Sequence, residues 1–201
     1  MSGPGETAPT PEVVAPDGPR IYVASLSDYN AGILHGTWLA ADLGAEVLHD
    51  GITEMLADSP TTKRYGEVAE EFAIHDYEGF GPVCLGEYES IERVAKLAHG
   101  LAEHGEPFGA WWAMETRDDE DWAEVESQFE QQYLGHYSSI EEYGEQMLDD
   151  MGVGIDELPG IPEGLRPYVK VDVEAWTRDM VLGGDITTAA SESGVYVFWG
   201  E

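Results

Sequence analysis

Short apolar runs separated by turn residues mark the chain from residue 20 to about residue 80. Isoleucine, valine and aromatic residues, which favour strands, are frequent in these runs, and residues 27–32 have a turn-like composition. The predicted elements are strands at Ile21–Leu26, Ile33–Leu39 and Glu71–Tyr77 and a surface helix at Glu46–Ala57 that Pro60 ends. This part of the chain is therefore predicted to form a small sheet that carries one helix.

From Glu87 onward the apolar positions follow helical spacing instead. The predicted helices are one capped by Ser90 and ended by Gly105, one along Trp122–Tyr133, one from Ser138 to Gly152 with Glu141 at the capping-box position, and one from Asp172 to about Leu182. Residues 153–167 are predicted to form a connection, and Val195–Trp199 a closing strand. The predicted fold class is α+β, with sheet at both ends and helices between.

The first nineteen residues differ from the rest of the chain. They contain five prolines and three glycines and little that could pack, so we expect residues 1–19 to form a disordered tail. The rest of the chain is expected to fold, because 42% of all residues are hydrophobic and 10% are aromatic.

The charge balance narrows the choice of partners. The chain has 41 acidic and nine basic residues, a formal net charge of −32, and residues 118–163 contain no Lys or Arg. Because nucleic-acid affinity comes largely from Lys and Arg that neutralise phosphates, we expect no direct binding of DNA or RNA. A basic partner is favoured, and imitation of DNA is the most specific hypothesis. An acidic solubility surface and adaptation to high salt are the alternatives.

Motifs for catalysis are absent from the sequence. The six histidines form no HExxH or His-x-His pattern, and no Gly-x-Ser-x-Gly elbow, Walker or GxGxxG pattern occurs. Cys84 is the single cysteine, which excludes an intramolecular disulfide and a Cys-based zinc site. We expect no catalytic residue, metal or cofactor. No apolar stretch is long enough to span a bilayer and no signal peptide is recognisable, so we expect a cytoplasmic location.

Acids on the second and third predicted helices are the candidate partner-binding residues. At three- and four-residue spacing their Cβ atoms lie about 5–6 Å apart on one helix face, so their oxygens form rows that resemble phosphates. The candidates are Asp118, Asp119, Glu120, Asp121, Glu124, Glu126, Glu130, Glu141, Glu142, Glu145, Asp149 and Asp150. The closing strand is apolar on both faces, which predicts a buried strand or a contact between subunits.

Five parts of the chain carry distinctive sequence: Arg20–Leu39, Phe72–Phe80, Met147–Gly152 with Asp156–Pro159, Glu174–Met180 and Gly194–Phe198. In this order along the chain, they resemble the ArdA family of antirestriction proteins. The resemblance implies an elongated, three-part homodimer without catalytic activity. Its acidic surface would imitate bent B-form DNA and occupy the DNA-binding groove of type I restriction-modification enzymes. Such proteins are carried by mobile genetic elements and protect incoming DNA from cleavage, and whether methylation is blocked as well stays open.

The family's three parts map onto the predicted elements. They are an N-terminal α/β domain at 20–83, a central helical domain at 84–130 and a C-terminal α+β domain at 131–201. In the family the last part holds the dimer contact, which we place at Val195, Tyr196, Val197 and Phe198. Two other function classes stay open: an acidic binding module for other basic DNA-binding proteins, such as nucleoid proteins or transcription factors, and an enzyme whose acidity is incidental.

Overall fold

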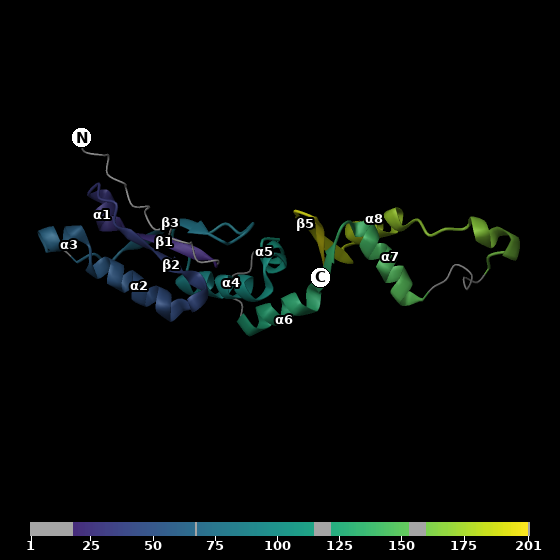
Figure 1. The fold of residues 1–201 in the computed structure, drawn as a ribbon, viewed down its shortest axis with the longest axis horizontal. Helices are drawn as coiled ribbons and strands as arrows, with labels where there is room; N and C mark the ends of the chain where they lie inside the picture. The colour runs from purple at the N-terminus through teal and green to yellow at the C-terminus, as the bar shows by residue number, and fades with distance from the viewer. Residues whose placement is uncertain (1–17, 67, 115–121, 153–159, 201) are drawn as a thin grey trace, which may run out of the picture.

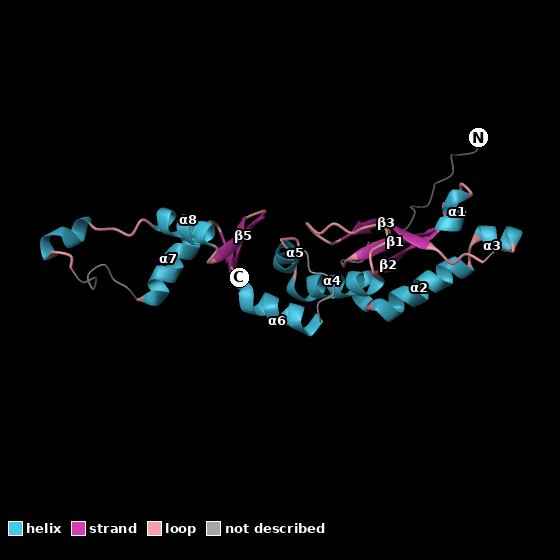
Figure 2. Cartoon of the chain, turned by 180° about the vertical axis from the view of Figure 1, so that it is seen from behind, coloured by secondary structure: helices cyan, strands magenta, loops and turns pink. Residues whose placement is uncertain are grey.

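The computed structural model describes residues 18–66, 68–114, 122–152 and 160–200. Figure 1 shows an elongated molecule in which the chain runs along the long axis. Two small antiparallel sheets lie on either side of a group of central helices, and Figure 2 shows the same order from behind. The architecture is therefore mixed α+β, as the apolar pattern predicts.

The first sheet has the strand order β2-β1-β3. Its strands are β1 (Arg20–Ser25), β2 (Gly36–Ala40) and β3 (Phe72–Glu78). Helix α2 (Ala45–Ala57) follows the short 3₁₀ helix η1 (Ala41–Leu43) and contacts both β1 and β2. It buries Leu48, Ile52 and Met55 in the same apolar cluster as Ile21 and Val23 of β1. The three predicted strands and the predicted helix are all present, although β2 begins later than expected.

Two short helices in this part of the chain were not predicted. Residues 27–32 do not form a simple turn, because Ser25 accepts a hydrogen bond from the backbone N–H of Asp28 and caps helix α1 (Leu26–Asn30). Helix α2 ends at Ala57, before Pro60, as predicted; Pro60 itself begins a further helix that was not predicted, α3 (Pro60–Tyr65), which Ser59 caps. Proline is well tolerated in the first helical turn, since its missing N–H has no partner there.

The central helices are α4 (Ile91–His104), α5 (Glu106–Trp112) and α6 (Trp122–Gln132). Helix α4 begins and ends as predicted, with Ser90 accepting from the backbone N–H of Arg93 at 3.4 Å and Gly105 following its last turn. Helix α5 was not predicted, because seven residues are too few for a periodic pattern. The buried ring of Phe108 lies 5.3–5.8 Å from the rings of Trp111, Trp112, Trp122 and Phe129. This aromatic cluster joins α5 to α6.

The second sheet has the order β4-β6-β5, formed by β4 (Tyr133–Tyr137), β5 (Ile186–Ser191) and β6 (Gly194–Trp199). Only β6 was predicted. Helices α7 (Ile140–Met151) and α8 (Val173–Gly183) pack against each other beside this sheet. The 3₁₀ helix η3 (Glu163–Tyr168) begins inside the predicted connection and ends one residue after it. Gly152 ends α7 and Asp172 caps α8, as predicted. The cap of α7 is Ser139 rather than Ser138, and Glu142 rather than Glu141 reaches back to the cap region.

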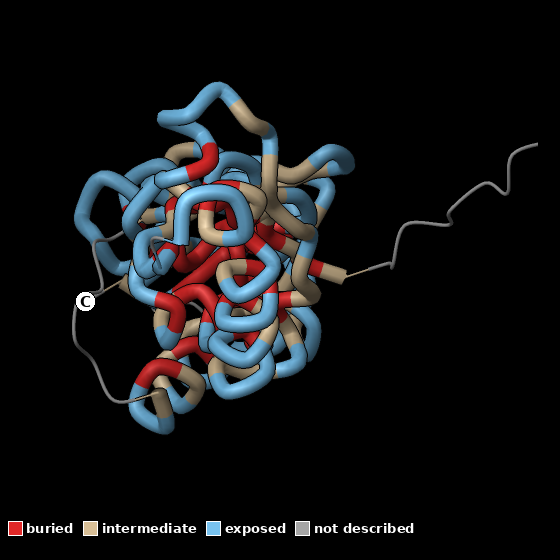
Figure 3. Tube along the Cα trace, turned by 90° about the vertical axis from the view of Figure 1, so that its left-hand side faces the viewer, coloured by how far each residue is buried: buried red, intermediate tan, exposed pale blue. Residues whose placement is uncertain are grey.

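The buried side chains of the described residues form two clusters. The larger cluster runs from the first sheet through the central helices to Tyr196 and Phe198 on one face of β6, and the smaller one lies on the other face around Val197. Figure 3, which looks along the molecule, shows the buried segments inside a layer of exposed ones. Val83 and Ile91 belong to the same cluster, so one core spans the predicted boundary at residue 83. The division into three domains stays a prediction.

None of the helices in the described ranges combines the length and the apolar character needed to cross a membrane.

Candidate partner-binding acidic surface

The densest group of candidate acids lies on α7. The buried side of this helix contacts α8, where a methyl group on Gly144 would overlap Thr177. Glu141, Glu145 and Asp149 follow one another at four-residue steps, which advance a helix by about 6 Å each. Glu142 and Asp150 lie beside this row; Glu142, Glu145, Asp149 and Asp150 are exposed residues, and Glu141 has intermediate exposure.

Hydrogen bonds keep the first-turn acids of α7 ionised. The Ser139 hydroxyl and the backbone N–H of Glu141 lower the pKa of Glu141. The hydroxyl and backbone N–H of Ser138 both donate to Glu142 Oε2 at 2.6 Å and lower the pKa of Glu142. The helix N-terminus also favours negative charge at these positions. Both side chains therefore stay charged at lower pH than an ordinary glutamate.

Helix α6 carries three more of the candidates. Val125 and Phe129 are buried, whereas Glu124 and Glu130 are exposed. Glu126 is partly buried, and its Oε1 lies 3.9 Å from Nε2 of His99 on α4. The other four predicted acids, Asp118, Asp119, Glu120 and Asp121, lie outside the described residues.

Helix α2 carries a further acidic row, which lies outside the stretch without Lys or Arg. Glu46, Asp50 and Glu54 are all exposed and repeat every four residues. Leu48 and Ile52 lie on the opposite, buried side. The signal was present in the sequence as the four-residue spacing. We call the exposed acids of α2, α6 and α7 together the acidic helix faces.

The acidic helix faces succeed one another along the molecule. In Figure 1, α2, α4 and α6 follow each other along the lower edge, and α7 lies beyond the second sheet. Several described cations are already paired with carboxylates elsewhere: Arg20 with Glu78, Lys63 with Asp58, Arg93 with Glu89, and Arg178 with Asp179. Neither α6 nor α7 contains a Lys or Arg, so their negative charge is not offset within either helix.

A second titratable cluster joins α4 to α6. His99 Nε2 lies 3.4 Å from Glu103 Oε2 and 3.9 Å from Glu126 Oε1, and the ligand atoms of the three residues all lie within 4.8 Å of one another. The sequence shows the His99-x-x-x-Glu103 spacing. It does not show that a carboxylate from another helix completes the cluster, because that contact depends on how α6 packs against α4.

The candidate dimer-contact residues, Val195–Phe198, lie in β6, the central strand of the second sheet. β4 pairs with one edge of β6 and β5 with the other. Tyr196, Val197 and Phe198 are at most 8% exposed within a single chain. Of the two interpretations of this strand, the buried strand is therefore the one that the structure shows. The contact between copies that the family resemblance implies at Val195–Phe198 stays a prediction.

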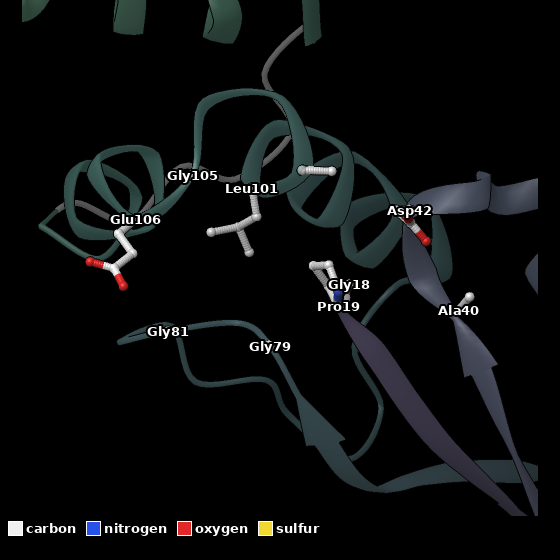
Figure 4. Close-up of a pocket in the computed structure, with 10 residues that line it drawn as sticks. Gly18, Pro19, Ala40, Asp42, Gly79, Gly81, Leu101, Gly105 and Glu106 are labelled. Carbon is white, nitrogen blue, oxygen red and sulfur yellow. The ribbon is translucent and has the colours of Figure 1, made fainter. Parts of the chain in front are cut away.

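A cavity of about 690 Å³ lies between the first sheet and the α4–α5 corner (Figure 4). Its described lining consists mostly of glycine, alanine and backbone, with the carboxylates of Asp42 and Glu106 on opposite sides. Glu106 accepts a hydrogen bond from the Tyr196 hydroxyl at 2.9 Å; burial and this bond raise the pKa of Tyr196 to about 12. The described lining residues include no His, Cys or Lys. The cavity therefore offers no recognisable set of catalytic groups.

A known protein family matches most of the chain. A sequence model of the ArdA family, described as an antirestriction protein, matches residues 21–195. The comparison with curated proteins found no match. The matched span begins in β1 and ends in β6, so it covers both sheets and the helices between them. The chain therefore belongs to the ArdA family of antirestriction proteins.

Proposed function

We propose that this protein acts as a DNA mimic, whose acidic helix faces occupy the DNA-binding groove of a type I restriction-modification enzyme. Membership of the ArdA family implies an antirestriction function. That family is not a known family of enzymes, and the mechanism proposed needs no catalytic group. The inhibitor and the DNA would compete for one basic surface on the enzyme.

The observation that carries the proposal is the charge spacing on α7. The helix has 12 residues, which span about 18 Å at about 1.5 Å per residue. Its five acids therefore supply one negative charge per about 3.6 Å of axis, close to the one phosphate per about 3.4 Å of a single DNA strand. The acidic rows on α2 and α6 are sparser, so α7 is the best mimic among the described helices.

Burial explains why the carboxylates face outward. The apolar sides of α2, α6 and α7 are committed to the two buried clusters, and the acids occupy what remains of each helix. An enzyme groove lined with Lys and Arg would attract such a surface from a distance and bind it through many weak contacts. No single carboxylate is then expected to be decisive.

Neutralising α7 tests the proposal. We expect the variant E141Q/E142Q/E145Q/D149N/D150N to need about tenfold more protein, or more, for half-inhibition of ATP-dependent cleavage by a type I enzyme. Five exposed charge contacts at about 0.2–1 kcal/mol each sum to about 1–5 kcal/mol, and about 1.4 kcal/mol is tenfold. Any one of these substitutions alone should hardly change inhibition.

A matched control separates charge placement from total charge. The variant E70Q/E71Q/D76N/E87Q/E192Q removes the same number of exposed carboxylates from strands and loops, and we expect it to inhibit nearly as well as the unchanged protein. Equal inhibition by both variants would overturn the role of α7. Displacement of unrelated DNA-binding proteins from DNA at the same concentration would favour a general acidic binding module instead.

A further inference from the structure

The cluster of His99, Glu103 and Glu126 has the composition of a metal site rather than of a phosphate mimic. His99 and Glu103 lie one turn apart on α4, and Glu126 reaches them from α6. One imidazole nitrogen and two carboxylates form a ligand set that suits Zn²⁺ and similar transition metals. The other exposed acids of α6, Glu124 and Glu130, take no part in the cluster. We propose that these three residues bind one divalent transition-metal ion of the Zn²⁺ class, which clamps α6 to α4.

The distances fit this proposal. Ligand atoms about 2.0–2.2 Å from a tetrahedral Zn²⁺ ion lie about 3.3–3.6 Å from one another. The His99 Nε2 to Glu103 Oε2 distance of 3.4 Å is already in that range, and that from His99 Nε2 to Glu126 Oε1 is 3.9 Å. All the ligand atoms lie within 4.8 Å of one another, so small rotations of the two long glutamate side chains would bring all three ligand atoms to coordination distance from one ion.

The surroundings favour a cation and leave it a free coordination position. A cleft of about 400 Å³ adjoins the cluster, and His99 and Trp122 line it together with Asp42, Glu92 and Lys96. Water in this cleft would supply the fourth ligand of a tetrahedral ion. The charged residues of this lining are two acids, Asp42 and Glu92, and one base, Lys96. The Trp122 ring packs edge-to-face against the imidazole, with the ring centroids 6.4 Å apart, and so restricts its orientation.

The imidazole distinguishes this site from loose ion condensation. A chain with a net charge of −32 attracts Mg²⁺ and Ca²⁺ at many carboxylates, and such binding is weakened by salt. Those ions prefer oxygen ligands, whereas Zn²⁺ also binds imidazole nitrogen strongly. A bound ion would tie α6, which leads directly into β4, to the central helix α4.

Competition against a chromophoric zinc chelator tests the site. We expect the purified protein, in physiological salt and excess Mg²⁺, to bind one equivalent of Zn²⁺ per chain. The variants His99→Gln and Glu126→Gln should each bind it at least about tenfold more weakly. Co²⁺ in place of Zn²⁺ should give visible absorption bands that His99→Gln removes.

Two matched controls are available on the same helices or their neighbours. His49→Gln removes a surface histidine that contacts a single carboxylate, Glu92, at 2.9 Å. Glu130→Gln removes the same charge as Glu126→Gln one turn further along α6. Both should keep the full Zn²⁺ affinity. The proposal is overturned if all four variants bind Zn²⁺ equally, or if binding is weak, occurs at several equivalents and disappears with Mg²⁺. No restriction enzyme enters these measurements, so they do not depend on the proposed function.

Discussion

Among the described residues, Asp28 is the one acidic residue that is completely buried, and it stabilises the fold rather than forming part of the acidic surface. Its Oδ1 accepts a hydrogen bond from the backbone N–H of Thr61 at 2.8 Å. Burial raises the pKa of Asp28, but hydrogen bonds from Ser59, Ser25 and Thr61 outweigh burial and hold the pKa at about 2. Asp28 lies on α1 and Thr61 on α3, so this carboxylate links α3 to α1, the helix that directly follows β1.

Removing the Asp28 carboxylate should destabilise the protein. We expect Asp28→Ala to lower the free energy of unfolding at neutral pH by about 1–3 kcal/mol, because it leaves the buried Thr61 N–H without an acceptor. Urea unfolding followed by circular dichroism measures this change. Asp50→Ala, on the exposed side of α2, is the matched control and should change stability by less than about 0.5 kcal/mol.

The effect should also depend on pH. The folded pKa of Asp28, about 2, lies below the ordinary value of 3.8, so its contribution is fully present above the ordinary value and is lost as the pH falls toward 2. The difference in unfolding free energy between the unchanged protein and Asp28→Ala should therefore shrink as the medium is acidified from neutrality to about pH 2. A difference that stays constant over this range would contradict the assignment.

Close packing determines how near two helices can approach each other, as the contact between α4 and α5 shows. Gly100 lies inside α4 at a point where a methyl group would overlap the buried ring of Phe108 on α5. The ring cannot move easily, because it is surrounded by the aromatic side chains of Trp111, Trp112 and Phe129. Glycine in a helix costs about 1 kcal/mol relative to alanine, yet it allows the two helices to approach.

Substitution of Gly100 tests this packing. We expect Gly100→Ala to lower the free energy of unfolding by about 1–3 kcal/mol, the usual cost of overfilling a packed core, despite the higher helix propensity of alanine. Gly183→Ala, at the end of α8 where the added methyl meets only ordinary contact, should leave stability unchanged or raise it slightly. Equal effects of the two substitutions in thermal unfolding would show that Phe108 does not restrict position 100.

The elements that sequence reasoning predicted are those with strong local signals. Helix α4 has a serine cap, a clear apolar period and a terminal glycine, and its predicted limits are confirmed. Strand β4 was missed because Tyr133 continues the helical spacing of Phe129. Its strand conformation depends on pairing with β6, which lies some sixty residues later in the chain. Strand β5, rich in threonine and alanine, likewise becomes a strand through its pairing with β6.

In the candidate site too, features that lie within one helix were predictable from the sequence, and contacts between helices were not. Spacing alone identified the row Glu141, Glu145 and Asp149, and the structure shows these acids on the outer side of α7. The row on α2 was equally visible as spacing but lay outside the stretch without Lys or Arg. The partnership of Glu126 with His99 was not predictable, since it depends on how α6 packs against α4.

At the scale of the whole molecule, shape and charge support the same proposal. The elongated chain in Figure 1 carries a formal charge of −32. A homodimer stays a prediction from the family resemblance. Two copies would carry twice this charge, −64, which equals the phosphate charge of about 110 Å of duplex at one charge per about 1.7 Å. The acids are spread over several faces, so the length of duplex that the dimer imitates is shorter than this.

Competition with DNA tests the central claim most directly. A labelled duplex that contains the recognition site is bound to a type I restriction-modification enzyme, and the unlabelled protein is titrated in at several duplex concentrations. Mimicry predicts that the protein displaces all of the DNA and that its apparent dissociation constant rises linearly with duplex concentration. A plateau with DNA still bound, or a stable complex that contains enzyme, DNA and this protein together, would contradict the claim that the acidic helix faces occupy the DNA groove.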